Sequence, residues 1–259
     1  MTRDGKIKMY DQDDALVEQW QCRDPALTNI TDLIMKMLSP LRGRALDVGC
    51  GTGRVTIRLA EQGFEVDALD VEEKVIDIAR RVAARRNLTI NFSVCDFVAQ
   101  GDSFADATYD VVVCTEVLEH LENWRPVVRI MCRVLKPGGT LVITVPHNPQ
   151  LYSVIDEHVG HYRRYRVADL APLFDGYEVT TFTTGFPFVR LVTWSYITML
   201  KLTGRRHAPE KLWQKGSAYR NFGSKIMYGL DKVDNLFNGL HQGMTLVVRA
   251  VKPVQERQL

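Results

Sequence analysis

The sequence predicts an α/β fold with a doubly wound, mostly parallel sheet of seven strands and helices on both of its faces. Strand-like apolar runs alternate with amphipathic helical stretches between residues 44 and 146, as successive strand–helix–strand units require. The run 109–115 is apolar almost throughout, which is typical of a strand covered on both faces. Three closely spaced glycines, Gly49, Gly51 and Gly53, follow the first apolar run and predict a tight strand-to-helix turn.

The elements are expected in the order that a parallel sheet requires. Strands are expected at 44–48, 65–70, 89–94, 109–115, 140–145, 177–184 and 244–251. Helices are expected at 54–62, 73–86 and 124–135, where apolar residues recur with helical spacing. The third helix is expected to stop at residues 136–139, because a proline and two glycines stand there.

The whole chain, residues 1–259, is expected to form one domain with two helical additions to its core. The core is expected to span residues 44–184 and 244–252. Residues 1–43 are expected to form an N-terminal helical cap, because apolar residues recur with helical spacing in its second half. About 60 residues separate the last two strands, which is too long for a structureless loop.

The residues between the last two strands, 185–243, are therefore expected to form a helical insertion with helices at 188–202 and 225–240. Open sheets bind ligands at the carboxyl ends of their strands. We expect both the N-terminal cap and this insertion to lie over those ends, where they would form a lid and define the ligand pocket.

The composition is that of a compact globular protein, with 46% hydrophobic and 25% charged residues. The net charge of +2 argues against nucleic acid as a partner, because binding a phosphate backbone calls for a concentrated basic surface. Five cysteines without a CxxC pair indicate reduced thiols. The charged stretch 1–14 lacks the apolar core of a signal peptide, so we expect a cytoplasmic location.

An apolar segment at residues 186–200 allows several interpretations. It is shorter than the roughly 20 residues of a membrane-spanning helix, and Arg190 interrupts it. It can be a lid helix that is buried against the core or against the partner in a homodimer. It can also be a helix that lies on a membrane surface as a peripheral contact, or one that lines a pocket for an apolar or lipid-linked molecule.

The glycine turn and a later carboxylate together predict a site for a nucleoside-bearing cofactor. Glycines leave no Cβ between the backbone and a ligand, and the helix that follows offers unpaired N–H groups. Asp70 ends the second strand about 20 residues later, where an acidic side chain can accept hydrogen bonds from both hydroxyls of a ribose. A dinucleotide fingerprint requires its third glycine at position 54, and Arg54 stands there instead.

The spacing of Asp47, Gly49, Gly51 and Gly53 resembles the first motif of the class I S-adenosylmethionine (SAM)-dependent methyltransferases. Proteins of this family have a Rossmann-like sheet and transfer the methyl group of SAM, which leaves S-adenosylhomocysteine. The resemblance implies that the glycine turn, with Cys50 in it, holds the methionine part of SAM. We therefore expect SAM rather than a nicotinamide dinucleotide as the cofactor.

Further positions match the family pattern one by one, and the resemblance extends over the first five expected strands. It implies that Asp70 binds the ribose and that Asp96 hydrogen-bonds the adenine amino group. It also implies that Val71 and Phe97 lie beside the adenine ring, and that Glu116 lies where the chain passes the methionine part of SAM. Aspartates at strand ends also cap helices, and this remains the alternative for the two aspartates.

Two stretches at the expected cleft contain candidate general bases, one after the fourth strand and one after the fifth. His161 is our first candidate and His120 our second, because the unperturbed pKa of histidine lies close to neutral pH. Arg163 and Arg164 stand beside the first candidate. They form either a clamp for an acidic substrate group or part of a solvated loop in which they pair with carboxylates.

A divalent metal ion is a further alternative. Glu116, Glu119 and His120 share one helical face by their spacing, and His161 can add a second imidazole. This set resembles the metal site of two methyltransferase subfamilies, which act on ubiquinone-precursor catechols and on the 3′ ends of small RNAs. The metal of those subfamilies positions hydroxyl groups of the acceptor.

The sequence therefore predicts a SAM-dependent methyltransferase that acts on an oxygen, or a nitrogen, of a small-molecule acceptor such as a biosynthetic intermediate. Oxygen is favoured, because the cleft histidines offer a base that can remove a hydroxyl proton. One alternative is a quinone-like or lipid-linked acceptor at a membrane surface, bound beside the metal. The alternatives from other classes are a SAM-binding regulatory module without turnover and an NAD-dependent oxidoreductase.

Overall fold

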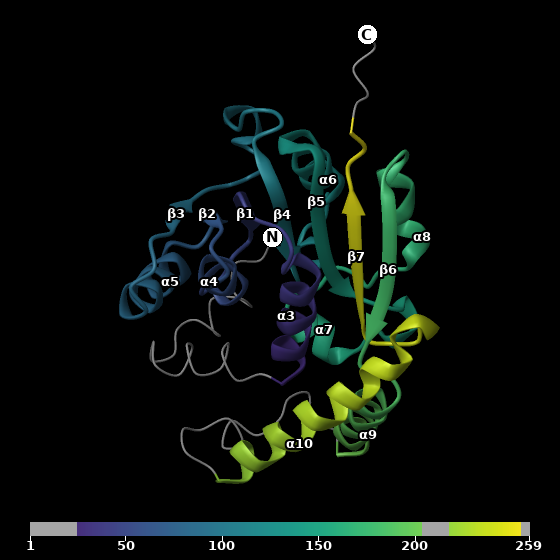
Figure 1. The fold of residues 1–259 in the computed structure, drawn as a ribbon. Coiled ribbons are helices and arrows are strands. Elements are labelled where there is room, and N and C mark those ends of the chain that lie inside the picture. The colour runs from purple at the N-terminus through teal and green to yellow at the C-terminus, as the bar shows by residue number, and fades with distance from the viewer. Residues whose placement is uncertain (1–24, 204–217, 255–259) are drawn as a thin grey trace.

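Seven strands form one sheet in the part of the chain that the computed structural model describes, residues 25–203 and 218–254 (Figure 1). They are β1 (Arg44–Val48), β2 (Glu65–Asp70), β3 (Asn91–Val94), β4 (Tyr109–Thr115), β5 (Leu135–Pro146), β6 (Glu178–Thr184) and β7 (Thr245–Val251). Their order is β3-β2-β1-β4-β5-β7-β6, and β7 runs antiparallel to both neighbours. The expected seven-stranded, mostly parallel sheet is confirmed.

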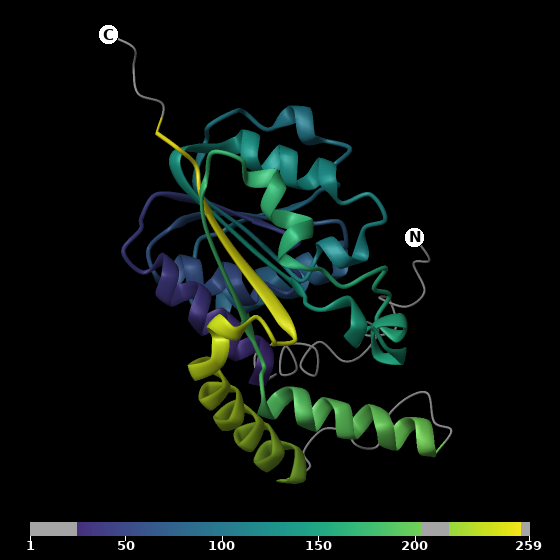
Figure 2. The same ribbon diagram turned by 90° about the vertical axis from the view of Figure 1, so that its right-hand side faces the viewer.

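Helices cover both faces of this sheet, as a doubly wound fold requires (Figures 1 and 2). One face carries α3 (Pro25–Leu38), α4 (Arg54–Glu61) and α5 (Glu73–Arg85), and the other carries α6 (Arg125–Val134) and α8 (Val167–Leu170). Towards the carboxyl ends of the parallel strands lie α7 (Val154–His158), α9 (Phe188–Leu202) and α10 (Ala218–Asp234), together with the short turns η2 (Leu118–His120) and η6 (Asn235–Leu240).

Alternate residues of the central strand β4 supply the two halves of the core, because successive side chains of a strand point to opposite faces. Val111 and Val113 pack with residues of α3 and α4, whereas Val112 and Cys114 pack with residues of α6. All four side chains are fully buried. The sheet therefore gives rigid support to the loops at its carboxyl edge, where the candidate site lies.

The described part of the N-terminal cap lies on the face of the sheet. Ile34 and Leu38 of α3 are fully buried and belong to the same cluster as Val113 and Val247 of the sheet. Our expectation that the cap lies over the carboxyl ends is therefore wrong for α3, because its apolar stripe is covered by the sheet itself. The expected cap began at residue 1, and residues 1–24 lie outside the described part.

The insertion between β6 and β7 forms two helices that extend beyond the carboxyl ends of the parallel strands (Figure 2). α9 has the expected bounds, and the second expected helix, 225–240, is observed as α10 followed by η6. Asp234 at the end of α10 is buried and accepts hydrogen bonds from the N–H groups of Phe188 and Val189, both at 2.9 Å. A carboxylate at a helix N-terminus is stabilising, and this one joins the bases of the two helices. Within the described ranges, no helix is both long enough and apolar enough to cross a bilayer.

Candidate functional site

The candidate site lies at the carboxyl ends of β1 and β4, the point at which the order of the strands reverses direction. Strands before β4 in the chain lie on one side of it and later strands on the other. Open α/β sheets bind ligands in the crevice outside the carboxyl ends at such a point. The glycine turn follows β1 and the turn η2 follows β4, so both predicted stretches lie at this point of the carboxyl edge, which we call the crevice.

The glycine turn is held in a conformation that favours glycine. Gly49, Gly51 and Gly53 all have positive φ, at 74°, 54° and 87°. The N–H groups of Gly49 and Cys50 donate to the carbonyl of Leu69 at the end of β2, at 2.8 and 2.9 Å. The turn is therefore fixed to the neighbouring strand as well as to the helix α4 that it begins.

Gly49 also makes the close contact that joins the two sides of the crevice. A Cβ at this position would stand 2.4 Å from Cγ2 of Val117, which follows β4. No Cβ can occupy that space, so the loop after β4 approaches the turn only because residue 49 is a glycine. Glu116 and Glu119 stand on either side of Val117 in the chain, and the contact therefore determines where both carboxylates lie.

Asp47 is a buried carboxylate beneath the glycine turn. Its Oδ2 accepts a hydrogen bond from Thr56 Oγ1 at 2.5 Å, whereas its Oδ1 has no hydrogen-bond partner among the described residues. Burial raises the pKa of Asp47 to about 6, helped by the nearby charge of Asp70 and opposed by the Thr56 hydroxyl. A buried anion without full compensation is costly, so a cationic or hydrogen-bonding ligand at the turn would relieve this group.

Asp70, predicted to bind ribose, also supports the turn. Its Oδ2 accepts from the N–H of Gly51 at 2.9 Å and its Oδ1 from the N–H of Glu72 at 3.0 Å. The capping role that the sequence left as an alternative is therefore present. Each carboxylate oxygen has two lone pairs, so these bonds leave capacity for hydroxyl groups.

The three residues predicted around the adenine differ in their surroundings. Val71 is 56% exposed at the edge of the sheet, so its apolar surface is open to a ligand. Asp96 is exposed, and its Oδ1 accepts from the N–H groups of Val98 and Ala99 at 3.0 and 3.1 Å. Phe97 is buried, and its ring contacts that of Phe104 in the core with centroids 5.1 Å apart. The ring of Phe97 is therefore packed inside the core.

Glu116 directly follows β4 in a strained conformation, with a φ of 54°. Such a φ is uncommon outside glycine and is often found at functional sites. Its Oε1 accepts from Thr144 Oγ1 at 2.9 Å. Burial raises the pKa of Glu116, and Thr144, His161 and the arginines 54 and 164 act in the opposite direction. The carboxylate of Glu116 thus interacts electrostatically with Arg54, which follows the glycine turn, and with His161 and Arg164 of the later loop.

Three of the four predicted metal ligands come together in a compact group. Glu119 is fully buried, and its Oε1 lies 3.8 Å from Nε2 of His161 and 4.0 Å from Nε2 of His120. The two imidazole rings meet edge to face, with centroids 4.7 Å apart. Among the described residues these three form the group whose ligand atoms all lie within 4.8 Å of one another. Glu116, the fourth predicted ligand, is not part of it.

Asp156 orients His161, a role that sequence reasoning missed. It is almost fully buried, and its Oδ1 lies 3.1 Å from Nδ1 of His161 and 2.8 Å from Nε of Arg164. Burial acts to raise the pKa of Asp156, but the hydrogen bonds from His161, Arg164 and Ser153 outweigh it and lower the pKa. The one sequence signal was Ser153, three residues earlier, which forms a capping box with Asp156.

The two arginines of this loop are engaged with the protein. Arg164 bonds Asp156, and Arg163 donates from Nη2 to the carbonyl of Glu122 at 2.8 Å. Tyr165 is buried and donates its hydroxyl proton to the carbonyl of Leu118 at 2.8 Å. These contacts attach the loop to η2 and to the segment after β5, so the arginines help to hold His161 in position.

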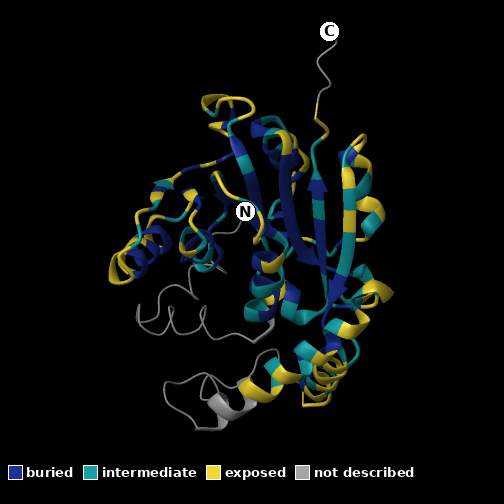
Figure 3. Ribbon diagram, viewed as in Figure 1, coloured by how far each residue is buried: buried dark blue, intermediate teal, exposed yellow. Residues whose placement is uncertain are grey.

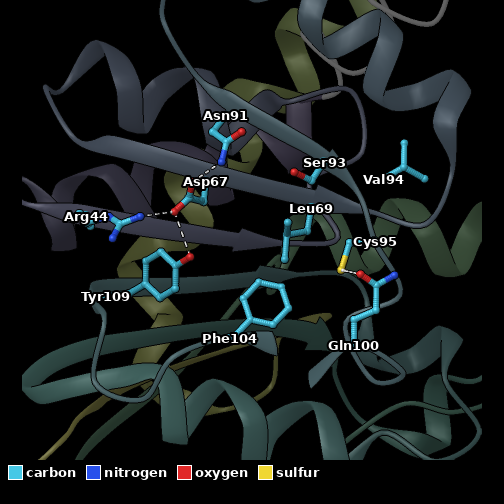
Figure 4. Close-up of a pocket in the computed structure, with 10 residues that line it drawn as sticks. All are labelled: Arg44, Asp67, Leu69, Asn91, Ser93, Val94, Cys95, Gln100, Phe104 and Tyr109. Atoms are coloured by element: carbon cyan, nitrogen blue, oxygen red, sulfur yellow. Dashed lines mark hydrogen bonds and ion pairs between the residues drawn. The ribbon is translucent and has the colours of Figure 1, made fainter. Parts of the chain in front are cut away.

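A hollow of about 330 Å³ lies elsewhere on the sheet, against β1 to β4 (Figure 4). In its polar part, Asp67 accepts hydrogen bonds from Arg44, Asn91 and Tyr109 at 2.7 to 3.0 Å. None of the predicted cofactor or catalytic residues lines it. Asp67 is thus bonded to three neighbouring side chains, and we assign no role to the hollow.

Comparison with known proteins relates the core to methyltransferases. Residues 46–143 match a family model described as a methyltransferase domain. The chain is 34% identical over 117 residues to a ubiquinone biosynthesis O-methyltransferase of Rickettsia conorii, an alignment that covers 45% of this chain and 39% of that protein. The chain thus spans less than half the length of the curated relatives that it matches first.

Solved structures agree on the fold. Phosphoethanolamine N-methyltransferase 2 of Haemonchus contortus, in complex with SAM, superposes with a TM-score of 0.65 at 17% identity, over 96% of this chain and 60% of that one. The cyclase SpnF superposes with a TM-score of 0.59 at 22% identity, over 88% and 81%. At these identities the likeness shows a shared fold, and one fold hosts several reactions. Together with the family match, it confirms the predicted resemblance to class I methyltransferases.

The residues present fit SAM. The three glycines of the turn offer bare backbone, and the exposed Val71 offers apolar surface. Beneath the turn, the buried Oδ1 of Asp47 has no hydrogen-bond partner among the described residues. A ligand with a cationic amino acid part and an adenosine part suits these groups.

The raised pKa of Asp47 predicts how stability depends on pH. The folded-state pKa of about 6 lies above the ordinary value of 3.8, so the stability associated with the protonated form is complete below about pH 4 and is lost as the pH rises through about 6. At 1.36 kcal/mol per unit, the loss is about 3 kcal/mol. Asparagine does not titrate, so Asp47→Asn should not show this loss. The difference in free energy of unfolding between the variant and the wild type, measured by denaturant titration, should therefore shift by about 3 kcal/mol in favour of the variant between pH 4 and pH 7. Parallel curves for the two proteins would contradict the buried position of this carboxyl.

Proposed function

We propose that this chain is a SAM-dependent methyltransferase, because residues 46–143 match a methyltransferase domain, and that it transfers a methyl group to a hydroxyl oxygen of a small-molecule acceptor. The observation that supports an oxygen acceptor is the group of Asp156, His161, Glu119 and His120 beside the glycine turn. The O-methyltransferase named among the relatives of the core agrees with this choice.

The glycine turn and its neighbours are proposed to hold SAM. Asp47 and the N–H groups of the turn would face its amino acid part, and Asp70 its ribose. Val71 and Asp96 would contact the adenine. When bound, SAM supplies a methyl group on a positively charged sulfur, which is a strong electrophile. The task left to the protein is to hold the acceptor in line in a dry site, which contributes roughly 7 to 11 kcal/mol of the acceleration.

His161 is proposed to remove the proton of the acceptor hydroxyl. An ionised carboxylate only accepts hydrogen bonds, so the contact with Asp156 places the imidazole proton on Nδ1 and leaves the lone pair on Nε2. A proton taken up at Nε2 creates an imidazolium between the carboxylates of Asp156 and Glu119, at 3.1 and 3.8 Å. Both negative charges stabilise that cation. Asp156 is thus a positioning residue.

A metal-assisted version of the same reaction is a second candidate, supported by the Glu119, His120 and His161 group. Ligand atoms 3.8 to 4.0 Å apart can converge on one ion, because metal–nitrogen and metal–oxygen bonds are about 2.0 to 2.2 Å long. One carboxylate with two imidazoles suits a divalent ion of the manganese-to-zinc series. Such an ion would bind and acidify the acceptor hydroxyl.

Two rivals from other classes predict different behaviour. A nicotinamide oxidoreductase would bind NAD, which Arg54 in place of the third glycine of the fingerprint disfavours. A SAM-binding regulatory module would bind SAM without producing a methylated molecule. Incubation with methyl-labelled SAM and a metabolite extract separates the second rival, because the proposed enzyme labels a metabolite and the module labels none.

Replacing Asp70 with asparagine should weaken SAM binding. The substitution leaves one acceptor oxygen in place of two, so one of the hydrogen bonds from the N–H groups of Gly51 and Glu72 is lost. It also removes the charge that strengthens hydrogen bonds to ribose, so the Kd for SAM measured by calorimetry should rise about tenfold or more. Asp77→Asn on α5, a half-exposed carboxylate that pairs with Arg80, is the matched control and should bind like the wild type. Unchanged affinity in Asp70→Asn, or tighter binding of NAD than of SAM, would sink the proposed cofactor role.

Replacing His161 with glutamine should lower the rate of label transfer. Loss of a general base reduces the rate constant by about 10² to 10⁴-fold, while the Kd for SAM should not change. His158→Gln is the control, because His158 is exposed at the end of α7. Equal rates of transfer for the His161 variant and the control would exclude His161 as the base.

The metal version makes a separate prediction. Protein purified without chelator should contain one divalent ion per chain by elemental analysis, and the double variant His120→Gln/His161→Gln should contain none, because two of three ligands are lost. Removal of the ion with a chelator should abolish label transfer, and added manganese or zinc should restore it. If the metal-free protein has full activity, the metal-assisted reaction is excluded and the general-base mechanism stands.

A further inference from the structure

The outward face of α9 is apolar although it is open to solvent. Val189 and Leu200 are buried on one side of the helix. The opposite side carries an edge of exposed apolar residues at helical spacing: Phe188, Leu191, Val192, Met199 and Leu202, with Trp194 beside them. Leu202, Trp194 and Leu191 are 83%, 63% and 58% exposed. We call this set the apolar edge.

The apolar edge is the main part of a larger exposed apolar region on the insertion. Figure 3 shows that exposed positions are frequent along α9 and α10, and five of those on α10 and η6 are large apolar residues, namely Ile226, Val233, Leu236, Phe237 and Leu240. Single exposed apolar residues are common on proteins, but their accumulation on one element marks an interaction surface. The described residues leave this surface uncovered.

The position of α9 is fixed, so the apolar edge is a built feature. Asp234 accepts hydrogen bonds from the first two N–H groups of the helix, and Arg190 donates from Nη1 to the carbonyl of Gln242 at 3.0 Å. Asp32 of α3 accepts from Lys232 and Tyr228 of α10 at 3.0 and 2.9 Å. These contacts hold the base of the insertion, while α9 extends away from the sheet (Figure 2).

Exposed lysines stand on the two helices of the insertion, and the sequence between these helices is basic. Lys201 is exposed near the end of α9, and Lys225 is exposed on α10. The sequence that connects the two helices carries four basic residues, Arg205, Arg206, Lys211 and Lys215, and one acidic residue, Glu210. The chain as a whole is close to neutral, with a net charge of +2, so this stretch of the sequence is more basic than the rest.

We propose that the apolar edge docks on the surface of an anionic lipid bilayer. A helix that combines apolar side chains with neighbouring lysines and arginines lies in the interface of such membranes, and tryptophan is enriched at that depth. The helix has 15 residues, which is short of the roughly 20 that a span requires. A second copy of the chain is disfavoured as the occupant, because it would bring the same positive charge to the contact.

Docking would turn the carboxyl edge of the sheet toward the membrane, because α9 leaves the body on that side (Figures 1 and 2). An acceptor that resides in the bilayer could then reach the crevice without crossing water. Docking itself requires neither SAM nor an acceptor, so it can fail while the proposed methyl transfer stands, and the reverse is equally true.

The test uses the full chain and sedimentation with vesicles. Wild-type protein should bind vesicles of phosphatidylcholine with phosphatidylglycerol and bind pure phosphatidylcholine at least about tenfold more weakly. Raising the salt from about 0.1 M to about 0.5 M should weaken the binding severalfold, because screening shortens the range of the attraction. The variant Leu191→Glu/Leu202→Glu should bind at least about tenfold more weakly, because it removes two large apolar side chains from the contact.

Val254→Glu is the matched control, since Val254 is 72% exposed after β7, at the opposite end of the sheet. It should bind vesicles as the wild type does. Equal circular dichroism spectra and equal melting temperatures of all variants show that they are folded. Absence of wild-type binding to the anionic vesicles, or equal binding by the double variant, would overturn the proposal. A wild-type dimer that the double variant loses, without vesicle binding, would overturn it in favour of a second copy.

Discussion

The close approach of the turn after β1 to the loop after β4 is the constraint on which the candidate site depends. Gly49 permits it, because a side chain there would occupy the space of Val117. The contact brings the glycine turn close to the loop that carries the carboxylates of Glu116 and Glu119. The rigid sheet below, with β4 buried on both faces, keeps the two loops in register.

The buried carboxylates at this edge differ in how many hydrogen-bond and charge partners offset their loss of hydration. These differences suggest their roles. Asp156 is fully engaged with Arg164 and His161, which suits a positioning residue. Glu119 faces two imidazoles, a pairing that suits proton transfer or a metal ion. Asp47 has a hydrogen-bond partner for only one oxygen, which suits a partner supplied by a ligand. Uncompensated burial of charge is expensive, so such a group is better explained by binding than by folding.

Helices and strands that are defined by a short run of consecutive residues were predicted correctly from the sequence. The bounds of β4 and α9 agree with the expected ones, because continuous apolar runs between turn residues define them. Three features escaped prediction, because tertiary packing determines them. α3 lies on the face of the sheet, the ring of Phe97 points into the core toward Phe104, and Asp156 joins His161 to Arg164. Periodicity identifies an apolar stripe but not the surface that covers it, and spacing in the chain does not reveal a partner from another loop.

The central claim is that the crevice between the glycine turn and the loop after β4 is a SAM site. A crystal structure of the protein soaked with S-adenosylhomocysteine tests it most directly. The account predicts density for the adenosine between Asp70 and Asp96, with the amino acid part over Gly49 to Gly53 and the sulfur facing the side of His161. Density for the ligand elsewhere, for example in the hollow beside Tyr109, or an unchanged crevice at saturating ligand, would contradict it.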